Sequence, residues 1–341
     1  MPNKLLEIIE KNGPSHTIIW SDPPSGLRAF LVLDNMELGP AAGGIRTHRY
    51  ASEGEALRDA LALARAMTIK CALAGLEAGG GKCVLLDHPG LDRARAFAFL
   101  GKRIEELRGA FRTAGDLGTT AADLRILAAH TRYVHTDERG LSASVARGLV
   151  QCIKACAVER GYRNIQGLRV AIQGMGVIGT AVASALSGEG AQLFCADLNP
   201  GRAEQVVRVL GGRILPADEI LLAEVDIVAP CAGSGVLTAD LAERMPAWAV
   251  CGAANNILAS PQAERILCER GILMVPDPIA SAGAVIDGIG QSVMGLADRK
   301  PLIDRLFETA RQVLSLCKQT GRLPSEIARE WAFRRIQSGK W

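Results

Sequence analysis

Aromatic residues make up only 4% of this 341-residue chain, so its cores must be aliphatic; hydrophobic residues still reach 48%. A chain of this length and composition suggests about two domains with sizeable cores. An excess of charge of one sign is also missing, since 39 basic residues face 36 acidic ones for a net charge of +3. Such a balance argues against a nucleic-acid or anionic membrane partner.

Targeting and metal signals are missing as well. We see no apolar run of membrane-spanning length, and the opening MPNKLLEIIEKNG has no signal-peptide core. The nine cysteines show no C-x-x-C pair and no zinc-site spacing. Packed, reduced thiols are then expected, which indicates a cytoplasmic protein without a metal site.

The segment 67–82, MTIKCALAGLEAGGGK, is the first candidate for chemistry. Two lysines frame it, Lys70 and Lys82, and three glycines at 79–81 deliver the second one. Glycine lets the backbone approach another group closely. A lysine held there and partly desolvated can lose its proton near neutral pH and act as a base.

Two other interpretations compete for this segment. A phosphate-binding loop needs Gly six residues before the lysine and Ser or Thr after it. Leu76 and Cys83 occupy those places, so this interpretation fails. A flexible glycine turn followed by a solvated lysine stays open.

A second motif lies at 168–179, LRVAIQGMGVIG. A short apolar run typical of a buried parallel strand precedes Gly174, Gly176 and Gly179 in G-x-G-x-x-G spacing. In such a turn the glycines allow a tight bend, close approach of a pyrophosphate, and helix–strand packing. The next apolar run ends at Asp197, where a carboxylate can bind a ribose 2′-hydroxyl and repel a 2′-phosphate. Strand, helix and acid together predict dinucleotide binding.

The coarse pattern predicts an α/β fold with two domains. An N-terminal α/β domain is expected over 1–143, and a Rossmann-type, doubly wound parallel sheet over 144–319. A C-terminal helix of about 320–341 is expected to pack back on the first domain. Within that first domain we expect a long helix capped by Ser52 with Glu55 as a capping box, and a helix from near Thr120. Expected strands are His16–Trp20, LRAFLVLD and KCVLLD in the first domain, and LRVAIQG, AQLFCAD, GGRILP, VDIVAPC, WAVCGAA and GILMVPD in the second.

Five stretches carry a resemblance to a known family: GPAAGGIR (39–46), MTIKCALAGLEAGGGK (67–82), TAGDLGTT (113–120), VAIQGMGVIG (170–179) and CGAANN (251–256). APC (229–231) and PDPIASAGAVI (276–286) add weaker matches. The chain resembles the leucine/phenylalanine/valine dehydrogenase branch of the Glu/Leu/Phe/Val dehydrogenases over nearly its whole length. The resemblance implies reversible, NAD-dependent oxidative deamination of an L-amino acid to a 2-oxo acid and ammonia. It also implies a homo-oligomer assembled through a first domain that is both catalytic and oligomerising.

The resemblance also implies roles for three ionisable residues. Lys70 would bind the substrate carboxylate, Lys82 would act as general base toward the attacking water, and Asp116 would move protons to and from the substrate nitrogen. This matches the chemistry, which needs a fixed cation and a base with a tuned pKa. The alternative for Asp116 is an N-cap for the helix near Thr120.

Further residues follow from the motifs and the resemblance. Asn255 would face the nicotinamide ribose, with an ordinary turn residue after a strand as the alternative. The expected cofactor-binding set is Gly174, Gly176, Val177, Gly179, Asp197, Cys231, Ala232, Ala254, Asn255 and Ser281. The expected pocket for the substrate side chain is lined by Ala42, Gly43, Ala114, Val285 and Gly288.

Departures from the family pattern bear on the substrate. Ala42 replaces the usual leucine, and the absence of a cation there argues against glutamate. Ala42 and Gly288 are both smaller than their family counterparts, which predicts a bulky apolar or aromatic substrate. Asp287 would accept a cationic or hydroxylated side chain if it pointed inward, and is otherwise a solvated helix residue. Ser281 replaces an asparagine, and Val145 a threonine.

Two other functions remain open on the sequence. One is an NAD-dependent oxidoreductase acting on an unusual amine or imine, and the other is a dinucleotide-binding regulator without turnover. The presence of Lys70, Lys82 and Asp116 together favours an enzyme, since a decayed site has no physical reason to keep them in register.

Overall fold

The structure is a computed structural model that describes residues 5–137 and 139–339. Contacts within the chain divide it into two compact units. Unit 1 holds the described residues up to 137 together with 288–297 and 332–339, and unit 2 holds 139–287 and 298–331. The division predicted at 143/144 lies inside a helix that begins at Leu141.

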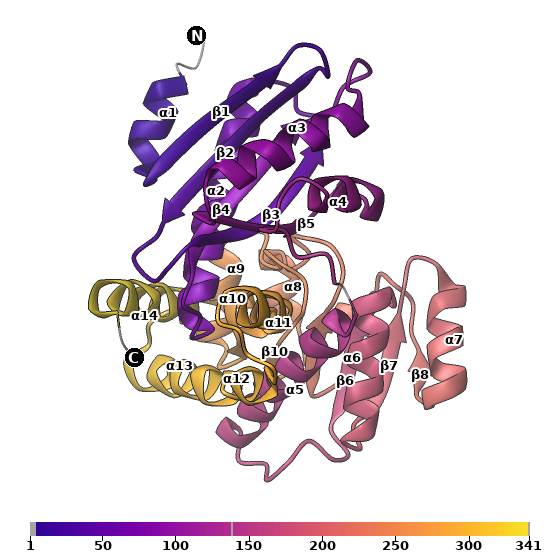
Figure 1. Cartoon of the computed structure of the whole chain (residues 1–341). Coiled ribbons are helices and arrows are strands. Elements are labelled where there is room, and N and C mark those ends of the chain that lie inside the picture. The colour runs from indigo at the N-terminus through magenta and orange to yellow at the C-terminus, as the bar shows by residue number, and fades with distance from the viewer. Residues whose placement is uncertain (1–4, 138, 340–341) are drawn as a thin grey trace. The chain divides into compact units, whose positions relative to one another are not determined.

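Unit 1 is built on a five-stranded sheet in the order β1-β2-β4-β3-β5 (Figure 1). β1 and β2 are antiparallel, as are β2 and β4, whereas β3 pairs in parallel with both β4 and β5. The strands are β1 (His16–Asp22), β2 (Leu27–Asn35), β3 (Ala41–His48), β4 (Gly79–Leu86) and β5 (Phe111–Gly115). The sequence pattern predicted β1, β2 and part of β4, but missed β3 and β5 as strands.

Helices cover both faces of this sheet, which explains the near-continuous apolar run of β2. Phe30 and Val32 pack with α2 on one face, whereas Leu31 and Leu33 pack with Phe97 of α3 on the other. This is the two-residue alternation of a strand with two buried faces. The helices of the N-terminal part of unit 1 are α1 (Leu5–Asn12), α2 (Glu53–Leu73), α3 (Arg93–Glu106) and α4 (Ala121–Ala128).

Both predicted helix starts are confirmed in this unit, with one change. The Ser52 hydroxyl accepts from the Glu55 amide at 3.2 Å, as a cap should, but the Glu55 carboxylate accepts from the amide of Ala51 at 2.9 Å. At α4, Thr120 and Asp123 form the full reciprocal capping box. Asp116 is therefore not the cap of that helix, and the alternative role considered for it is wrong.

The glycines at 79–81 do not form a turn, because they lie inside β4. A Cβ at Gly79 would lie 1.7 Å from the carbonyl oxygen of Asn35, and one at Gly80 would lie 2.2 Å from the amide nitrogen of Thr68. These glycines are needed so that β2 and α2 can pack directly against the β4 backbone. The flexible-turn interpretation is wrong, and the close approach is to the protein itself.

The far end of α2 is held by an arginine from the C-terminal helix. Arg335 is 7% exposed, and its guanidinium donates to the carbonyl oxygens of Cys71, Ala72 and Leu76 at 2.6 to 3.1 Å. A basic side chain at this place satisfies carbonyls that a helix end leaves without intrahelical donors.

Unit 2 contains a six-stranded, all-parallel sheet in the order β11-β10-β9-β6-β7-β8. Read from the other edge, the strands run third, second, first, fourth, fifth, sixth along the chain, which is the doubly wound dinucleotide-binding order. The strands are β6 (Arg169–Gln173), β7 (Gln192–Ala196), β8 (Arg213–Ile214), β9 (Ile227–Pro230), β10 (Ala249–Val250) and β11 (Leu273–Met274). All six lie within the predicted strand segments, which confirms the predicted sheet, although β8, β10 and β11 are only two residues long.

Helix α5 (Leu141–Glu159) contradicts the expectation that no apolar run reaches membrane-spanning length. By length and composition it could cross a membrane, although 56% of its apolar 18-residue stretch is buried in the protein. It packs with α6 and α13, and burial on several sides accounts for its apolar character. The other helices are α6 (Val177–Gly188), α7 (Pro200–Leu210), the 3-10 helix η1 (Ile220–Leu222), α8 (Ala239–Arg244), α9 (Pro261–Glu269), α10 (Asp277–Ala280), α11 (Gly283–Ser292), α12 (Lys300–Asp304), α13 (Leu306–Thr320) and α14 (Pro324–Ser338).

Candidate active site

Lys82 and Asp116 meet in unit 1. Lys82 lies in β4, Asp116 directly follows β5, and β3 runs between these two strands. The Lys82 Nζ is 2.6 Å from Asp116 Oδ2. Lys82 is 6% exposed, which is rare for lysine unless it is paired. The structure thus brings together two of the three ionisable residues that the sequence singled out.

Glycine in β3 makes this meeting possible. A Cβ at Gly44 would lie 2.9 Å from the Asp116 Cβ, and one at Gly43 would lie 1.8 Å from the carbonyl oxygen of Gly81. Both distances are too short for any other residue. Gly43, expected in the substrate pocket, is therefore fixed first of all by strand packing.

The protonation of the pair is shifted by its surroundings. Burial lowers the pKa of Lys82 below its ordinary value, and this effect outweighs the opposing effect of the Asp116 carboxylate. Burial raises the pKa of Asp116, but the charges and hydrogen bonds of Lys82 and Arg46 lower it more, so its pKa lies below the usual range. A depressed lysine pKa beside an ionised carboxylate suits a general base.

Three further residues extend the pair, and sequence reasoning gave them no role. The Arg46 Nε donates to Asp116 Oδ2 at 3.0 Å, and its Nη1 donates to Asp59 Oδ2 at 3.1 Å. The Tyr50 hydroxyl donates to the same Asp59 oxygen at 2.5 Å. A signal existed for Arg46: two residues after Gly44 on a strand, it points to the same face.

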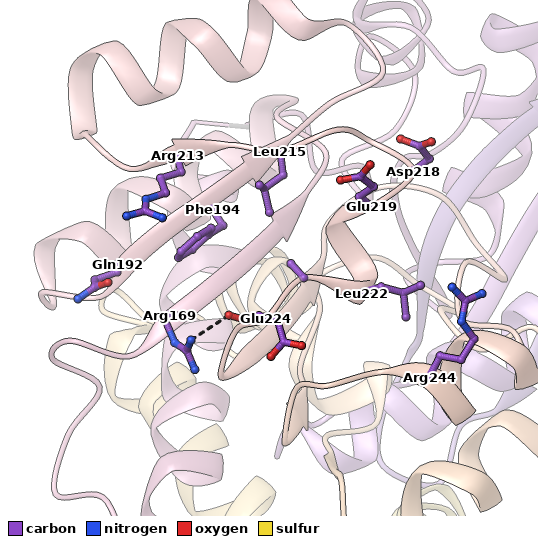
Figure 2. Close-up of a pocket in the computed structure, with 11 residues that line it drawn as sticks. Arg169, Gln192, Phe194, Arg213, Leu215, Asp218, Glu219, Leu222, Glu224 and Arg244 are labelled. Atoms are coloured by element: carbon purple, nitrogen blue, oxygen red, sulfur yellow. Dashed lines mark hydrogen bonds between the residues drawn. The ribbon is translucent and has the colours of Figure 1, made fainter.

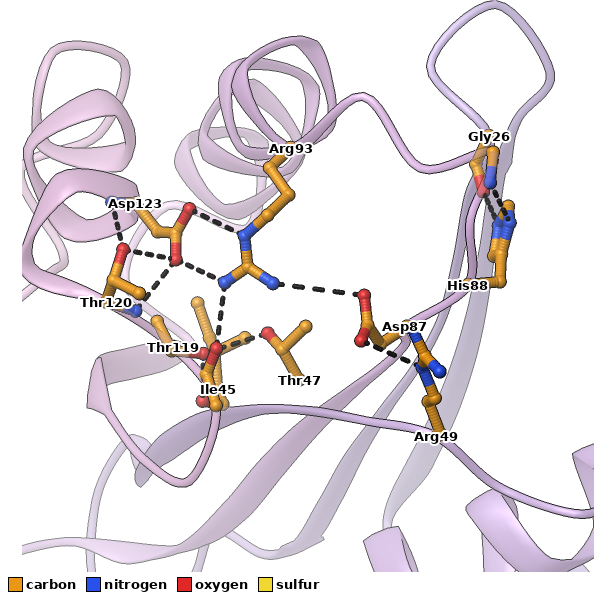
Figure 3. A network of polar contacts seen from close by, with 12 residues as sticks. Gly26, Ile45, Thr47, Arg49, Asp87, His88, Arg93, Thr119, Thr120 and Asp123 are labelled. Carbon is orange, nitrogen blue, oxygen red and sulfur yellow. Dashed lines mark hydrogen bonds and ion pairs between the residues drawn. The ribbon is translucent and has the colours of Figure 1, made fainter.

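A polar network anchors the loop that carries Asp116 (Figure 3). The Arg93 guanidinium lies between Asp123 and Asp87 and donates to the carbonyl oxygen of Gly118 at 2.8 Å. The Thr119 hydroxyl donates to the carbonyl oxygen of Ile45 in β3 at 2.7 Å. These contacts join the loop after β5 to both α3 and β3, which fixes the position of Asp116 at the start of that loop.

Lys70, the third ionisable residue, is half-buried in the last turn of α2. Within the substrate-pocket set, Ala42 is buried in β3 and Ala114 is half-buried in β5. Gly288 belongs to unit 1 and Val285 to unit 2. The roles expected for these residues stay predictions.

A histidine that sequence reasoning missed lies beside Gly288. A Cβ at Gly288 would lie 3.6 Å from His135 Cδ2, which is ordinary van der Waals contact. The His135 amide donates to the carbonyl oxygen of Thr113 at 2.7 Å, next to Ala114. No spacing in the sequence marks this histidine, because the contact joins residues far apart in the chain.

Asp287 contradicts one of its two alternatives. It is 9% exposed, so it is not a solvated helix residue. Its Oδ1 accepts from Arg299 Nε at 2.9 Å. The arginine neutralises this carboxylate, which removes the main reason to expect Asp287 to receive a cationic substrate side chain.

The glycine-rich turn of unit 2 has the geometry that its spacing predicted. Gly174 has φ +91°, and a Cβ there would lie 2.4 Å from the Cβ of Ala232. A Cβ at Gly179 would lie 1.7 Å from the carbonyl oxygen of Gly174, so helix–strand packing requires glycine. Gly176 is the N-cap of α6 and has open space around it, and Val177 in the first turn is 79% exposed. The amides of this turn can therefore face a phosphate group.

Asp197 directly follows β7 and binds the turn. Its Oδ2 accepts from the Met175 amide at 2.7 Å, and its Oδ1 accepts from the Asn199 amide at 2.8 Å. Arg202 Nη1 lies 3.9 Å from Oδ1. Each carboxylate oxygen can accept a further hydrogen bond, so the turn contacts leave room for a ribose hydroxyl.

The remaining cofactor candidates lie beyond the ends of the central strands. Burial raises the pKa of the Cys231 thiol to about 12, which makes it a packing group rather than a nucleophile. The Ser281 hydroxyl donates to the carbonyl oxygen of Asp277 at 2.6 Å, and its oxygen lies 3.2 Å from the side-chain amide oxygen of Asn255. Ala254 donates its amide to the carbonyl oxygen of Pro230 at 3.1 Å. Asn255 and Ser281 are thus brought together, as a shared site requires.

Unit 2 also has a cavity of about 680 Å³ that lies away from all these residues (Figure 2). It is lined by side chains of β6, β7, β8 and η1, with Phe194 and Leu215 on its apolar side. Its arginines are engaged: Arg169 donates to Asp226 and to the carbonyl oxygen of Glu224, and Arg213 lies over the Phe194 ring. This cavity has no buried ionisable group comparable with Lys82. In the described parts of the chain, no group of three or more His, Cys, Asp or Glu side chains could hold a metal ion.

Comparisons with known proteins identify two family matches. The model described as "Glu/Leu/Phe/Val dehydrogenase, dimerisation domain" matches residues 14–133, and the model described as "Glutamate/Leucine/Phenylalanine/Valine dehydrogenase" matches residues 202–295. Leucine dehydrogenase of Thermoactinomyces intermedius is 35% identical over 95% of this chain and 91% of its own. Valine dehydrogenase of Streptomyces coelicolor is 34% identical over 97% of this chain and 94% of its own.

A solved structure gives the same result for the fold and sequence together. The crystal structure of L-tryptophan dehydrogenase from Nostoc punctiforme has a TM-score of 0.88 at 30% identity and covers 98% of both chains. A hetero-hexameric glutamate dehydrogenase from Thermus thermophilus has a TM-score of 0.75 at 21% identity and covers 98% of this chain and 94% of its own, a likeness of fold alone.

Proposed function

The chain belongs to the Glu/Leu/Phe/Val dehydrogenase family, and from that premise we propose that it catalyses the reversible, NAD-dependent oxidative deamination of a bulky apolar or aromatic L-amino acid. The observation that carries the proposal is the buried contact between Lys82 and Asp116. It places a lysine that can act as a base within hydrogen-bond distance of an ionised carboxylate that can carry protons.

The residues of unit 1 divide the proton work. Lys70 binds the substrate carboxylate and so orients the α-carbon. Lys82, in its uncharged form, takes a proton from the water that attacks the oxidised carbon of the substrate. Asp116, which starts as a carboxylate, takes a proton from the substrate ammonium group before the hydride leaves. It later returns that proton to the nitrogen, which departs as ammonia, and the reverse direction uses the same transfers backwards. The lowered pKa of Lys82 places part of the population in the basic form at a lower pH than that of a solvated lysine.

The turn of unit 2 fits a dinucleotide. Gly174, Gly176 and the amides that begin α6 would hold the pyrophosphate, and Asp197 would hold the adenosine ribose. When bound, NAD accepts the hydride that leaves the substrate α-carbon. We propose NAD rather than NADP because the Asp197 carboxylate would repel a 2′-phosphate. Arg202, 3.9 Å from that carboxylate, is the one observation that favours the phosphate.

The pocket residues support a large substrate. Ala42 and Gly288 leave space that leucine and valine would fill, and each methylene of that space can hold part of a larger side chain, worth about 0.8 kcal/mol per buried CH₂. Relatives named for leucine, valine and tryptophan all match nearly the full chain. Within this range we propose phenylalanine, tryptophan or leucine ahead of valine.

Assembly and compartment belong to the same proposal. Residues 14–133 match a dimerisation domain, and β1 is an edge strand whose Ile19 is 56% exposed. An unpaired strand edge can pair with a second chain, which supports a homo-oligomer. All nine cysteines lie in the described residues and are free thiols, which supports a cytoplasmic protein. The near-balanced charge of +3 supports the absence of a nucleic-acid or anionic membrane partner.

A panel of L-amino acids tests the proposal. Each is incubated with NAD, and NADH formation is followed by its absorbance. We expect turnover with phenylalanine, tryptophan or leucine, together with release of one ammonia per NADH. NADH formation from amines without ammonia release, or no turnover with any amino acid, would contradict the proposal.

A further inference from the structure

The carboxylate of Asp116 is shared by two cations. Its Oδ2 accepts from Lys82 Nζ at 2.6 Å and from Arg46 Nε at 3.0 Å, so both positive groups compete for one oxygen. A guanidinium stays charged at any pH at which the protein folds, whereas a lysine can release its proton. The two cations therefore differ: Arg46 keeps its charge, whereas Lys82 can lose its proton to become neutral.

On the other side, Arg46 is held by a second carboxylate. Its Nη1 lies 3.1 and 3.4 Å from the two oxygens of Asp59, and Tyr50 donates to Asp59 as well. Arg46 thus bridges Asp59 of α2 and Asp116. Its guanidinium cannot move without breaking at least one of these two contacts. The guanidinium is 22% exposed at the side chain, so its charge is only partly screened.

We propose that Arg46 is a positioning residue that keeps Lys82 available as an uncharged base, because it neutralises the carboxylates that would otherwise hold the proton on Lys82. The inference rests on the proposed function, in which Lys82 is that base. It adds Arg46 of β3 to the site. Arg46 contacts neither the attacking water nor the transferred hydride, but it determines the protonation state of Lys82, which takes the proton from the water.

The signs follow from the charges around Lys82. Asp116 and Asp59 favour its protonated form, and Arg46 disfavours it. On β4 itself, burial raises the pKa of the neighbouring Cys83 thiol to about 12, so this group adds no charge. Helix α2 also carries Lys70, which is unchanged in every variant below.

Two single substitutions should therefore move Lys82 in opposite directions. Arg46→Gln removes the cation and leaves both carboxylates, so the pKa of Lys82 should rise. Asp59→Asn leaves the cation with one carboxylate fewer, so the pKa should fall. The double variant should return toward the parent protein, and Arg46→Lys should stay closer to it than Arg46→Gln.

The direct measurement is the titration of Lys82 in the free protein. Lysine labelled with ¹³C at Cε gives one signal per residue, the chain has only nine lysines, and the Lys82→Arg spectrum assigns the signal. Arg95→Gln, which removes an exposed surface arginine paired with Asp92, is the matched control and should leave Lys82 unmoved. The pH dependence of kcat/KM should follow the same order, its rising limb moving to higher pH in Arg46→Gln and to lower pH in Asp59→Asn.

The outcomes separate this inference from the proposed function. If neither the parent nor any variant turns over an amino acid, the proposed function fails. The titration of Lys82 still decides the role of Arg46. A Lys82 pKa that is unchanged in Arg46→Gln, or that moves the same way in both single variants, overturns the inference. Should Arg46→Gln fail to fold, Asp59→Asn and Arg46→Lys carry the test, and an unchanged or raised pKa in Asp59→Asn overturns it.

Discussion

Gly44 lies so close to Asp116 that a Cβ added at residue 44 would be 2.9 Å from the Asp116 Cβ and 2.6 Å from the carbonyl oxygen of Gly115. The neighbouring backbone cannot yield without moving the end of β5. The position of Asp116 therefore depends on the absence of a side chain at Gly44, on the neighbouring strand β3.

Replacing Gly44 by Ala should therefore displace Asp116 from Lys82. We expect kcat to fall roughly 10- to 100-fold, since a shift of about 1 Å in a catalytic group can cost about 100-fold. Steady-state kinetics and the melting temperature measure the two consequences together. Gly188→Ala is the control: a Cβ at that residue of α6 meets nothing within 4 Å, so both values should be unchanged or slightly improved.

Cofactor choice should follow the charge at residue 197. Asp197→Asn keeps one acceptor oxygen, for the Met175 amide, but removes the negative charge, so the ratio of kcat/KM for NADP to that for NAD should rise. Adding Arg202→Ala to it should lower that ratio again, because the nearby cation is lost. A parent protein that uses both cofactors equally well would contradict the assignment of Asp197.

Refilling the pocket should narrow the substrate range. Ala42→Leu and Gly288→Val each add methylenes where a large side chain is expected to lie, so kcat/KM for tryptophan and phenylalanine should fall relative to valine. Discrimination by size is limited to roughly 10- to 200-fold per methylene. Val at 288 also meets His135, whose Cδ2 is 3.6 Å from the added Cβ. If the parent prefers valine to both phenylalanine and leucine, the enlarged-pocket argument is wrong.

Acid stability should depend on the carboxylate that anchors the Asp116 loop. Burial raises the pKa of Asp123, but hydrogen bonds from Arg93 and Thr120 lower it more, to a value below the usual range. A lowered pKa stabilises the fold above the unfolded value of about 3.9, and this stabilisation is lost as pH falls through the folded value. The urea midpoint of Asp123→Asn should therefore lie below that of the parent at pH 7, with the difference shrinking toward pH 3.

The control for this experiment is Asp240→Asn, which removes a solvent-exposed partner of Arg244. Exposed ion pairs contribute little to stability, so its midpoint should follow the parent at every pH. A difference between Asp123→Asn and the parent that stays constant with pH would show that lost hydrogen bonds alone, not the charge, are responsible.

Much of unit 2 could be predicted because its physics is local. Each parallel strand is an apolar run bounded by turn residues, and the glycine spacing at 174–179 reflects contacts within one turn. Unit 1 was harder to predict. β3 contains Gly43 and Gly44 and β5 is five residues long, so neither has the composition typical of a strand.

The candidate site shows the same division. The sequence singled out Lys82 through the glycines before it and Asp116 through the family resemblance, although nothing local shows that they meet. The contact of Arg46 with Asp116 joins residues 70 positions apart, and that of His135 with Gly288 joins residues 153 positions apart. The glycines at 79–81 were misread because a turn and a tightly packed strand need glycine for different reasons, and only tertiary packing distinguishes them.

The most direct test of the account is the Lys82→Ala variant, measured in parallel for NADH binding and for amino-acid oxidation. We predict that NADH binds as it does to the parent, because its expected site lies in unit 2, while kcat falls about 100- to 10,000-fold, as for the loss of a positioned general base. A variant that keeps a near-normal kcat would contradict the central claim that Lys82 is the base.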